Sequence, residues 1–198
     1  MAGSSCHIHT SLVDERGRNV FWNESEGRPS EPFEHFLAGM MAQARHLSVF
    51  FAHNPNSYKR YRSSSFAPVS IAWGRDNRTC GFRIVGRAQS LRIENRIPGA
   101  DVNPYLAYAA LLAAGTDGVK QKRKLPAEAA GNAYADESVA RVPRSVPEAL
   151  QALEAGSLAV KAFGPEVVEH IRHWVEMEYQ ALDMQVSDRE RMRYLERV

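Results

Sequence analysis

Two histidines and a serine alternate near the start of the chain, in the segment GSSCHIHTSL. Side chains at alternate positions of a β-strand point to the same face of the sheet. A strand over residues 6–12 would therefore present His7, His9 and Ser11 together. Imidazole is the commonest metal ligand among protein side chains, so this spacing is a moderate indication of a metal site.

A second alternating set lies in RIENR, where Arg92, Glu94 and Arg96 would share one face of a strand. By itself this triplet is also typical of a solvated strand face with alternating charges. The segments before it favour a binding site, because they contain several further basic residues: Lys59, Arg60, Arg62, Arg78 and Arg83. Guanidinium groups bind carboxylates and phosphates through paired hydrogen bonds, so many of them near one carboxylate predict a site for oxyanions.

The two sets together indicate a cation beside phosphate-binding arginines. Imidazole nitrogens and the Glu94 carboxylate are ligands that divalent cations accept. A cation and several arginines together offset the negative charge of ATP phosphates. The chain has neither the Gly-x-x-x-x-Gly-Lys loop of P-loop proteins nor a GxGxxG fingerprint. We therefore expect a nucleotide site on a fold other than these two.

The elements that must hold these residues follow from apolar periodicity and turn signals. We expect a strand at 6–12, a turn at 14–18, a return strand at 19–22 and a polar loop at 23–29. Further strands are expected at 69–73, 79–85 and 90–97. Residues 33–51 carry apolar side chains at helical spacing, with Ser30 as the cap and Pro32 in the first turn.

The second half of the chain is predicted to be helical. Asn103 and Pro104 begin a long apolar helix, and residues 120–143 form a long surface loop. SVPE at 145–148 and SDRE at 187–190 are capping-box patterns, and a helix at 166–185 follows the Gly164-Pro165 break. Strands come first and helices last, which predicts an α+β fold with an antiparallel sheet packed against helices.

Composition argues against several classes of protein. The 198 residues carry a net charge of +2 without a dominant basic block, so no nucleic-acid partner is expected. Cys6 and Cys80 are too few for a disulfide framework, which predicts a cytoplasmic protein. No apolar run of about 20 residues is present, so no membrane span is expected. Because the candidate site begins within the first residues, we expect the native protein to have further sequence upstream.

Four motifs, in order along the chain, carry a resemblance to a known family. GSSCHIHTSL, NSYKR, APVSIAWGRDNR and RIENRIPGADVNPYLAYAALLAAG resemble the glutamine synthetase superfamily, in the C-terminal part of its catalytic domain. The resemblance covers nearly all of residues 1–198. It implies a glutamine synthetase/guanido kinase-like catalytic fold that is incomplete here, with the family's N-terminal β-grasp domain absent.

The resemblance also implies an ATP-dependent glutamate–amine ligase. In this family ATP phosphorylates the γ-carboxylate of glutamate, and an amine then displaces phosphate from the acyl phosphate. Mg²⁺ or Mn²⁺ is the expected cofactor, and glutamate and an amine are the expected substrates. Full-length members form ring-shaped homo-oligomers that complete each site between neighbouring subunits, which this chain alone is not expected to do.

The resemblance assigns a role to individual residues of this chain. They are His7 and Glu94 for a cation; His9, Ser11, Arg78 and Arg92 for ATP; Gly3, Arg60 and Arg96 for glutamate; and Arg78 and Arg83 for catalysis at the phosphoryl group.

The chain departs from the ammonia-using members at one position. Those members carry PGYEAPV after the NSYKR arginine, whereas this chain has SSSFAPV, with Phe66 in the place of the glutamate. A phenyl ring accepts no proton, but it offers a weak cation–π contact and can line a pocket for a longer amine. SFAPV, AWGRDNR and RIENR resemble the γ-glutamylpolyamine and γ-glutamylethanolamide synthetase branch, so we expect an amine other than ammonia to be preferred.

Two alternatives differ in class from an enzyme of this family. The resemblance supplies only part of the cation ligands, so the chain alone is expected to be inactive and would then be a non-catalytic fragment or a nucleotide- or protein-binding module. A metallohydrolase built on His7 and His9 is disfavoured, because no matching ligand set is apparent among the other histidines: His35, His46, His53, His170 and His173.

Overall fold

A four-stranded sheet lies at the centre of the computed structural model, which describes residues 4–195 and 197. Its order is β1 (Ile8–Thr10), β6 (Arg92–Asn95), β5 (Phe82–Val85) and β4 (Trp73–Arg75). β1 and β5 run antiparallel to β6, whereas β4 runs parallel to β5. The α+β class is confirmed, but the sheet is mixed because the 76–81 connection loops back and places Phe82 beside Trp73.

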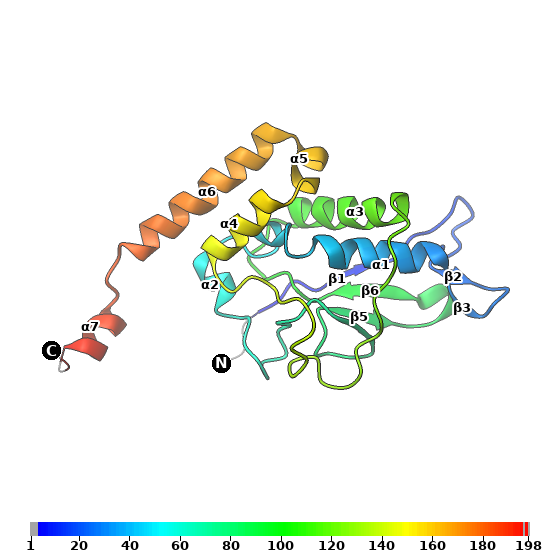
Figure 1. The fold of residues 1–198 in the computed structure, drawn as a ribbon, viewed down its shortest axis with the longest axis horizontal. Helices are drawn as coiled ribbons and strands as arrows, with labels where there is room; N and C mark the ends of the chain where they lie inside the picture. The colour runs from blue at the N-terminus through cyan, green and yellow to red at the C-terminus, as the bar shows by residue number, and fades with distance from the viewer. Residues whose placement is uncertain (1–3, 196, 198) are drawn as a thin grey trace.

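Two helices cover one face of this sheet, as Figure 1 shows: α1 (Glu31–Gln43) and α3 (Pro104–Lys120). Phe82, Ile84 and Ile93 of the sheet are buried in the same apolar core as Phe36 and Leu37 of α1. Because side chains alternate along a strand, the residues between them point away from the helices. The other face of the sheet therefore carries the side chains of Arg83 and Glu94.

The two covering helices begin at the predicted caps. The Ser30 side chain accepts a hydrogen bond from the backbone N–H of Phe33 at the start of α1. Asn103 accepts from the N–H groups of Tyr105 and Leu106 at the start of α3. Each cap satisfies backbone donors that have no partner within the helix.

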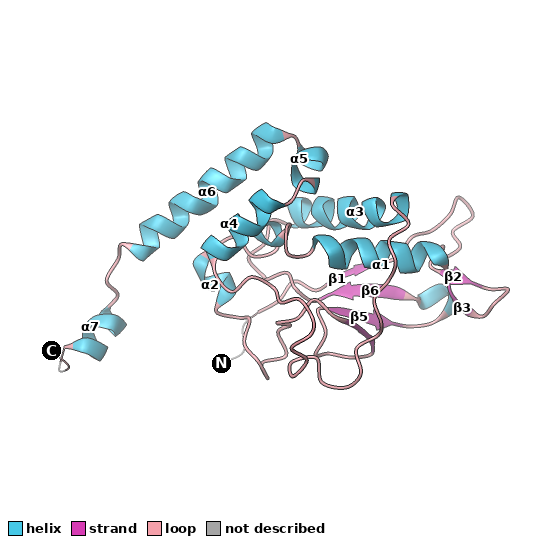
Figure 2. Cartoon of the chain, viewed as in Figure 1, coloured by secondary structure: helices cyan, strands magenta, loops and turns pink. Residues whose placement is uncertain are grey.

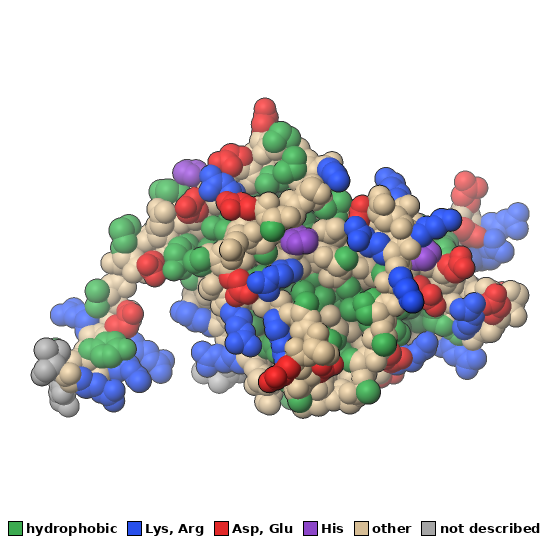
Figure 3. Space-filling view, in the orientation of Figure 1, with side chains coloured by type: hydrophobic (Ala, Val, Ile, Leu, Met, Phe, Trp, Pro, Cys, Tyr) green, Lys and Arg blue, Asp and Glu red, His purple; other side chains and the backbone are tan. Residues whose placement is uncertain are grey.

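The remaining elements surround this layer pair (Figure 2). They are β2 (Trp22–Asn23) and β3 (Arg28–Pro29), the 3-10 turns η1 (Ser48–Phe50) and η2 (Ala88–Ser90), α2 (Pro55–Tyr58), α4 (Val146–Ala155), α5 (Leu158–Phe163), α6 (Pro165–Asp183) and α7 (Asp188–Tyr194). α7 lies away from the sheet, shares a hollow with α2 and α6, and carries a group of Arg side chains, seen in Figure 3. None of the helices in the described residues is both long and apolar enough to span a membrane.

Several boundaries differ from the sequence-based expectations. The helix expected over 33–51 ends at Gln43. The prediction was too long because the apolar spacing continues beyond the helix, through a turn and η1, where Leu47 and Phe51 stay buried. The polar loop expected at 23–29 contains the small β2–β3 hairpin. β1, β5 and β6 are shorter than predicted, since burial of alternate residues extends beyond the hydrogen-bonded ladder. The strand predicted at 69–73 was misplaced: β4 is Trp73–Arg75, and Ser70 makes only an isolated bridge to Arg141.

Of the two capping boxes predicted in the second half of the chain, one forms completely and the other only in part. At Ser187 both halves of the capping box with Glu190 are present. At Ser145 only the serine half forms, because the Glu148 carboxylate instead accepts from Arg144 N–H and from the Arg45 guanidinium.

Candidate active site

Glu94 is the centre of the polar face of the sheet. Strand pairing places it directly opposite His9 on β1 and Arg83 on β5. Its side chain is only 4% exposed. The expected alternation of histidines and charged residues therefore brings both sets to one place.

The Glu94 carboxylate has three close partners. Oε1 lies 2.9 Å from His7 Nδ1 and 3.0 Å from Arg96 Nη1, and Oε2 lies 3.0 Å from Arg83 Nη1. His9 Nε2 is more distant, at 3.9 Å from Oε1. A buried carboxylate needs such partners, since an unpaired buried charge is strongly destabilising.

These partners fix the ionisation of Glu94. Burial alone raises the pKa of the carboxyl group, but the hydrogen bond from Arg83 and the charge of Arg96 outweigh it and bring the pKa below its ordinary value. The carboxylate is therefore ionised at neutral pH and carries the charge that a cation ligand requires.

His7 is held in its neutral form. Burial, followed by the charge of Arg96, lowers the pKa of the His7 imidazole, although Glu94 opposes the shift. A neutral imidazole has a lone pair on one of its ring nitrogens, and His7 Nδ1 lies 2.9 Å from Glu94 Oε1. His7 is thus in the state in which imidazole binds metals.

His9, Arg92 and Ser11 extend the site along β1 and β6. Arg92 Nε donates to His9 Nδ1 at 3.2 Å, and Arg92 Nη1 donates to the carbonyl oxygen of Ser90. The side chains of His9 and Arg92 are both accessible, and Ser11 is exposed just beyond the end of β1. These residues form an open polar strip next to Glu94.

Arg60 and Arg96 lie on the other side of Glu94. Arg60 is 9% exposed and donates to the carbonyl oxygen of Ile97, while its guanidinium stacks over the Tyr61 ring at 4.8 Å. Arg96 is 4% exposed and donates to the carbonyl oxygen of Phe66 at 3.0 Å. The Nε–H groups of Arg60, Arg83 and Arg96 are buried without a hydrogen-bond acceptor among the described residues.

Phe66 lies on an exposed loop above Arg96. Its side chain is 69% exposed, and its backbone has φ of 59°, in the left-handed region that a residue with a Cβ rarely adopts. Ser64 in the same loop has φ of 62°. Two left-handed residues that are not glycine mark this loop as held in a specific conformation by its contacts.

Arg78 and Gly3 are not brought to Glu94 by the described residues. Arg78 is exposed in the β4–β5 connection, and its side chain forms no ion pair within the described part of the chain. Gly3 lies outside the described residues. Six of the other predicted residues are linked by the contacts given above on one face of the sheet: His7, His9, Arg83, Arg92, Glu94 and Arg96. Arg60 instead binds the carbonyl oxygen of Ile97, and Ser11 and Phe66 are exposed.

Two contacts at the site were not found by sequence reasoning. Asp76 Oδ1 lies 2.9 Å from Arg83 Nη2, so the two ends of the Arg83 guanidinium bind two different carboxylates. Tyr134 donates through its hydroxyl to the carbonyl oxygen of Ala67, next to Phe66. Asp76 had a signal in the sequence, as an acidic residue in the turn before the arginine-bearing strand, whereas a contact from residue 134 to residue 67 has none.

The ligand set for a metal is incomplete within this chain. Across residues 4–195 and 197, no group of three or more His, Cys, Asp or Glu side chains is arranged to hold a metal ion. His7 and Glu94 have suitable donor chemistry, but two protein ligands rarely define a catalytic metal site. The residues present therefore fit a partial cation site.

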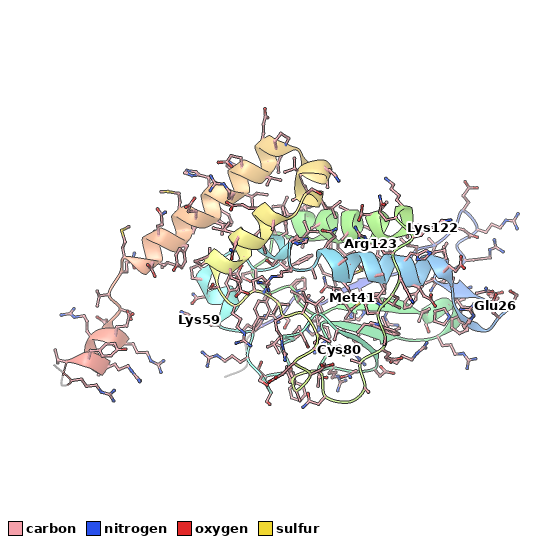
Figure 4. All side chains as sticks on the ribbon, viewed as in Figure 1. Glu26, Met41, Lys59, Cys80, Lys122 and Arg123 are labelled. Carbon is pink, nitrogen blue, oxygen red and sulfur yellow. The ribbon has the colours of Figure 1, made fainter. Side chains whose placement is uncertain are left out.

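Hollows elsewhere on the surface do not coincide with this group. One of about 720 Å³ lies between α1 and residues 123–140, where Met41 and Arg123 line it (Figure 4). Another, of about 620 Å³, lies beside the β2–β3 hairpin. Neither is lined by Glu94 or its partner arginines, so the candidate site is the open polar face of the sheet.

The described structure thus has a mixed sheet with helices on one face and a carboxylate–arginine–histidine cluster on the other. Residues 1–194 match the family model described as glutamine synthetase, catalytic domain. The chain belongs to the glutamine synthetase family.

Individual relatives agree with this membership. The chain is 48% identical over 198 residues to the γ-glutamylethanolamide synthetase GlnA4 of Streptomyces coelicolor, covering 100% of this chain and 42% of that protein. It is 41% identical to a glutamate–isopropylamine ligase of a Pseudomonas species, covering 98% of this chain and 43% of that protein. The chain thus spans less than half the length of these curated relatives.

A solved structure is similar over the same extent. A structure of GmaS in complex with ADP superimposes with a TM-score of 0.86 at 28% sequence identity. It covers 98% of this chain and 46% of that structure's chain. The described residues therefore have the fold of about half of the GmaS chain.

Proposed function

We propose that this chain is the C-terminal part of the catalytic domain of an ATP-dependent glutamate–amine ligase. The observation that carries the proposal is the Glu94 cluster, in which one buried carboxylate is shared by Arg83, Arg96 and His7. Glu94 and Asp76 balance the charges of Arg83 and Arg96. Arg60 and Arg92 form no ion pair within the described residues, so they are the positive charges that the face can offer to phosphate and carboxylate oxygens.

The residues divide into a nucleotide side and an amino acid side. His9, Ser11, Arg92 and Arg78 bind ATP, and Arg83 stabilises the phosphoryl group as it moves to the γ-carboxylate of glutamate. Arg60 and Arg96, with Gly3, hold glutamate. In this reaction a glutamate oxygen forms the new bond to phosphorus, ADP leaves, and an amine nitrogen then forms the amide as inorganic phosphate leaves.

His7 and Glu94 are the residues of this chain that would hold Mg²⁺ or Mn²⁺. Such a cation, when bound, neutralises charge on the phosphates. Neutral His7 and ionised Glu94 are in the protonation states that this role requires. Their further ligands would come from the part of the catalytic domain that this chain does not include.

The amine is proposed to be an alkylamine, polyamine or amino alcohol rather than ammonia. Phe66 supports this choice, because its exposed ring lies on the loop whose carbonyl oxygen Arg96 binds. Two of the similar proteins are a γ-glutamylethanolamide synthetase and a glutamate–isopropylamine ligase. A phenyl ring packs against the alkyl part of such an amine but provides no base to deprotonate ammonium.

The test is an amine panel on the full-length protein that contains this chain. Purified protein is incubated with ATP, glutamate, Mg²⁺ and either ammonium, isopropylamine, ethanolamine or putrescine, and the γ-glutamyl product is measured by mass spectrometry. We expect an organic amine to give the highest kcat/KM. A higher kcat/KM for ammonium than for every organic amine would overturn the choice of nucleophile. Absence of a γ-glutamyl product with all four amines would overturn the proposed ligase activity.

The alternative is a non-catalytic module. The incomplete metal ligand set within the described residues is the observation that favours it. In that case the full-length protein would bind ATP, measured by calorimetry, without forming a γ-glutamyl amide from any amine.

A further inference from the structure

The loop that carries Phe66 is strained and exposed. Ser64 and Phe66 both have positive φ, a backbone conformation that is strained for a residue other than glycine. Within the loop, the Ser65 hydroxyl bonds to the carbonyl oxygen of Arg62 at 2.6 Å. Contacts from outside the loop must offset the remaining strain.

Two side chains from distant parts of the chain hold adjacent carbonyl groups of this loop. Arg96 Nη2 donates to the Phe66 oxygen, and the Tyr134 hydroxyl donates to the Ala67 oxygen, each at 3.0 Å. Arg96 is itself bound to Glu94. The backbone on either side of the Phe66–Ala67 peptide is thus fixed to the charged cluster and to residue 134.

The segment around Tyr134 is anchored in turn on the β4–β5 connection. Ala133 N–H donates to the Thr79 hydroxyl at 2.9 Å, and Asn77 Nδ2 donates to the Gly131 oxygen at 2.7 Å. Burial raises the pKa of the Tyr134 phenol against the effect of Arg96, so the hydroxyl keeps the proton that it donates. The connection that carries Arg78 therefore supports the loop that carries Phe66.

We propose that Tyr134 is a positioning residue that latches the 63–67 loop and thereby sets the place of Phe66 in the amine pocket. The role of Phe66 in amine binding rests on the proposed function. The latch, meaning the hydrogen bond from the Tyr134 hydroxyl to the Ala67 oxygen, rests only on the geometry. Tyr134 acts through the loop backbone and is not a catalytic residue, because it is bound to a carbonyl group of the chain.

The latch is tested by hydrogen–deuterium exchange on the full-length protein. Tyr134→Phe removes only the hydroxyl and keeps the ring, and Tyr105→Phe, at an 83% exposed position on α3, is the matched control. We expect Tyr134→Phe to speed exchange about fivefold in a peptide covering residues 62–69, as loss of one hydrogen bond predicts. Exchange in α5 should stay the same in both variants. Unchanged exchange in 62–69 would overturn the latch.

The consequence for the amine is tested by kinetics on the same variants. We expect Tyr134→Phe to raise KM for the preferred amine about fivefold and to leave KM for glutamate and for ATP within twofold. In a Phe66→Ala background, Tyr134→Phe should have no further effect on KM for the amine, because its effect passes through that ring. Equal rises in all three KM values, or additive effects of the two substitutions, would overturn the positioning role. Absence of amide formation in the wild type would refute the proposed function instead, and the exchange experiment would still decide the latch.

Discussion

At the scale of the residue, the site depends on how one buried carboxylate shares its oxygens. Glu94 binds Arg83 with one oxygen, and His7 and Arg96 with the other. Each guanidinium keeps donors that Glu94 does not use, including the buried Nε–H groups of Arg83 and Arg96. A buried donor without an acceptor is costly, so these groups favour the arrival of an anionic oxygen.

A single substitution tests the proposed basis of amine choice. Phe66→Glu places a carboxylate on the exposed loop, where it can bind an ammonium ion and accept its proton. We expect the ratio of kcat/KM for ammonium to kcat/KM for the preferred organic amine to rise about tenfold in the full-length protein, an effect of about 1.4 kcal/mol.

Phe66→Gln is the matched control, because it has the shape of glutamate without the charge. It should lower kcat/KM for the organic amine without raising kcat/KM for ammonium, whereas Phe66→Glu should raise kcat/KM for ammonium itself. A similar gain with glutamine would show that loss of the ring, and not the new charge, changes the preference. An unchanged ratio with glutamate would contradict the assignment of Phe66 to the amine pocket.

Asp101 gives a prediction for pH dependence away from the cluster. Its Oδ2 accepts from the Ser57 hydroxyl at 2.6 Å and also from the Asn54 side chain, which fixes the start of α2 next to Arg60. Burial raises the pKa of the Asp101 carboxyl, but the hydrogen bonds from Ser57 and Asn54 outweigh it and bring the pKa below 3.8. The carboxylate is thus favoured more in the folded chain than in the unfolded chain.

This contribution to stability is present above pH 3.8 and is lost as pH falls through the lower folded pKa. We expect Asp101→Asn to lower the free energy of unfolding by about 1 kcal/mol at pH 6, and to differ less from wild type at pH 3. Urea unfolding, followed by circular dichroism at both pH values, measures the difference in the free energy of unfolding between Asp101→Asn and wild type. Glu15→Gln, in an exposed turn, should change neither value, and a constant difference for Asp101→Asn would contradict the ionic explanation.

At the scale of the element, the layer behind the site depends on close packing of α1 against α3. A Cβ atom added to Gly118 would lie 2.6 Å from Gly39 Cα and 2.7 Å from Gly39 N. Both are backbone atoms, so the helices would have to separate. We expect Gly118→Ala to lower the free energy of unfolding by about 1–3 kcal/mol, despite the better helix propensity of alanine.

Thr116→Ala on the exposed face of α3 is the control for helix propensity. It should leave the free energy of unfolding unchanged or raise it slightly. Thermal unfolding by calorimetry compares the two variants. A stabilised Gly118→Ala variant would show that the two backbones separate easily at this contact.

The elements also show what the sequence could predict. The starts of α1, α3 and α7 were correct, because a capping side chain and the nearby backbone decide them locally. The end of α1 and the parallel pairing of β4 were missed. Apolar spacing continues through η1, and strand direction depends on how the 76–81 connection folds. Burial alone does not determine either feature.

The same division holds for the site. The polar face was predictable, since alternation in HIH and RIENR needs only strand geometry, and the register places His9 opposite Glu94. The partners Asp76 and Tyr134 were missed, because their contacts with Arg83 and Ala67 depend on the paths of two irregular segments. The family resemblance gave the roles, whereas the physical chemistry of the strands gave the face on which they meet.

At the scale of the whole molecule, the central sheet has an apolar face and a polar face. The helices α1 and α3 cover one side of the sheet with apolar side chains (Figure 1), and the other side carries the Glu94 cluster. The C-terminal helices extend from this body, and α7 exposes Met192 and Tyr194.

The final prediction concerns the polar face of the sheet. Expressed alone, the 198 residues present His7 and Glu94 but no third metal ligand of the His, Cys, Asp or Glu type within the described part of the chain. We expect no γ-glutamyl amide above a protein-free blank when this chain is incubated with ATP, glutamate, amine and Mg²⁺. The full-length protein should form the amide under the same conditions.

The control for folding is a cooperative thermal transition of the short chain, since its core residues Phe21 and Leu37 are fully buried without any other segment. Turnover by the short chain at the rate of the full-length protein would mean that the Glu94 face suffices for catalysis, and the partial cation site would have to be redrawn.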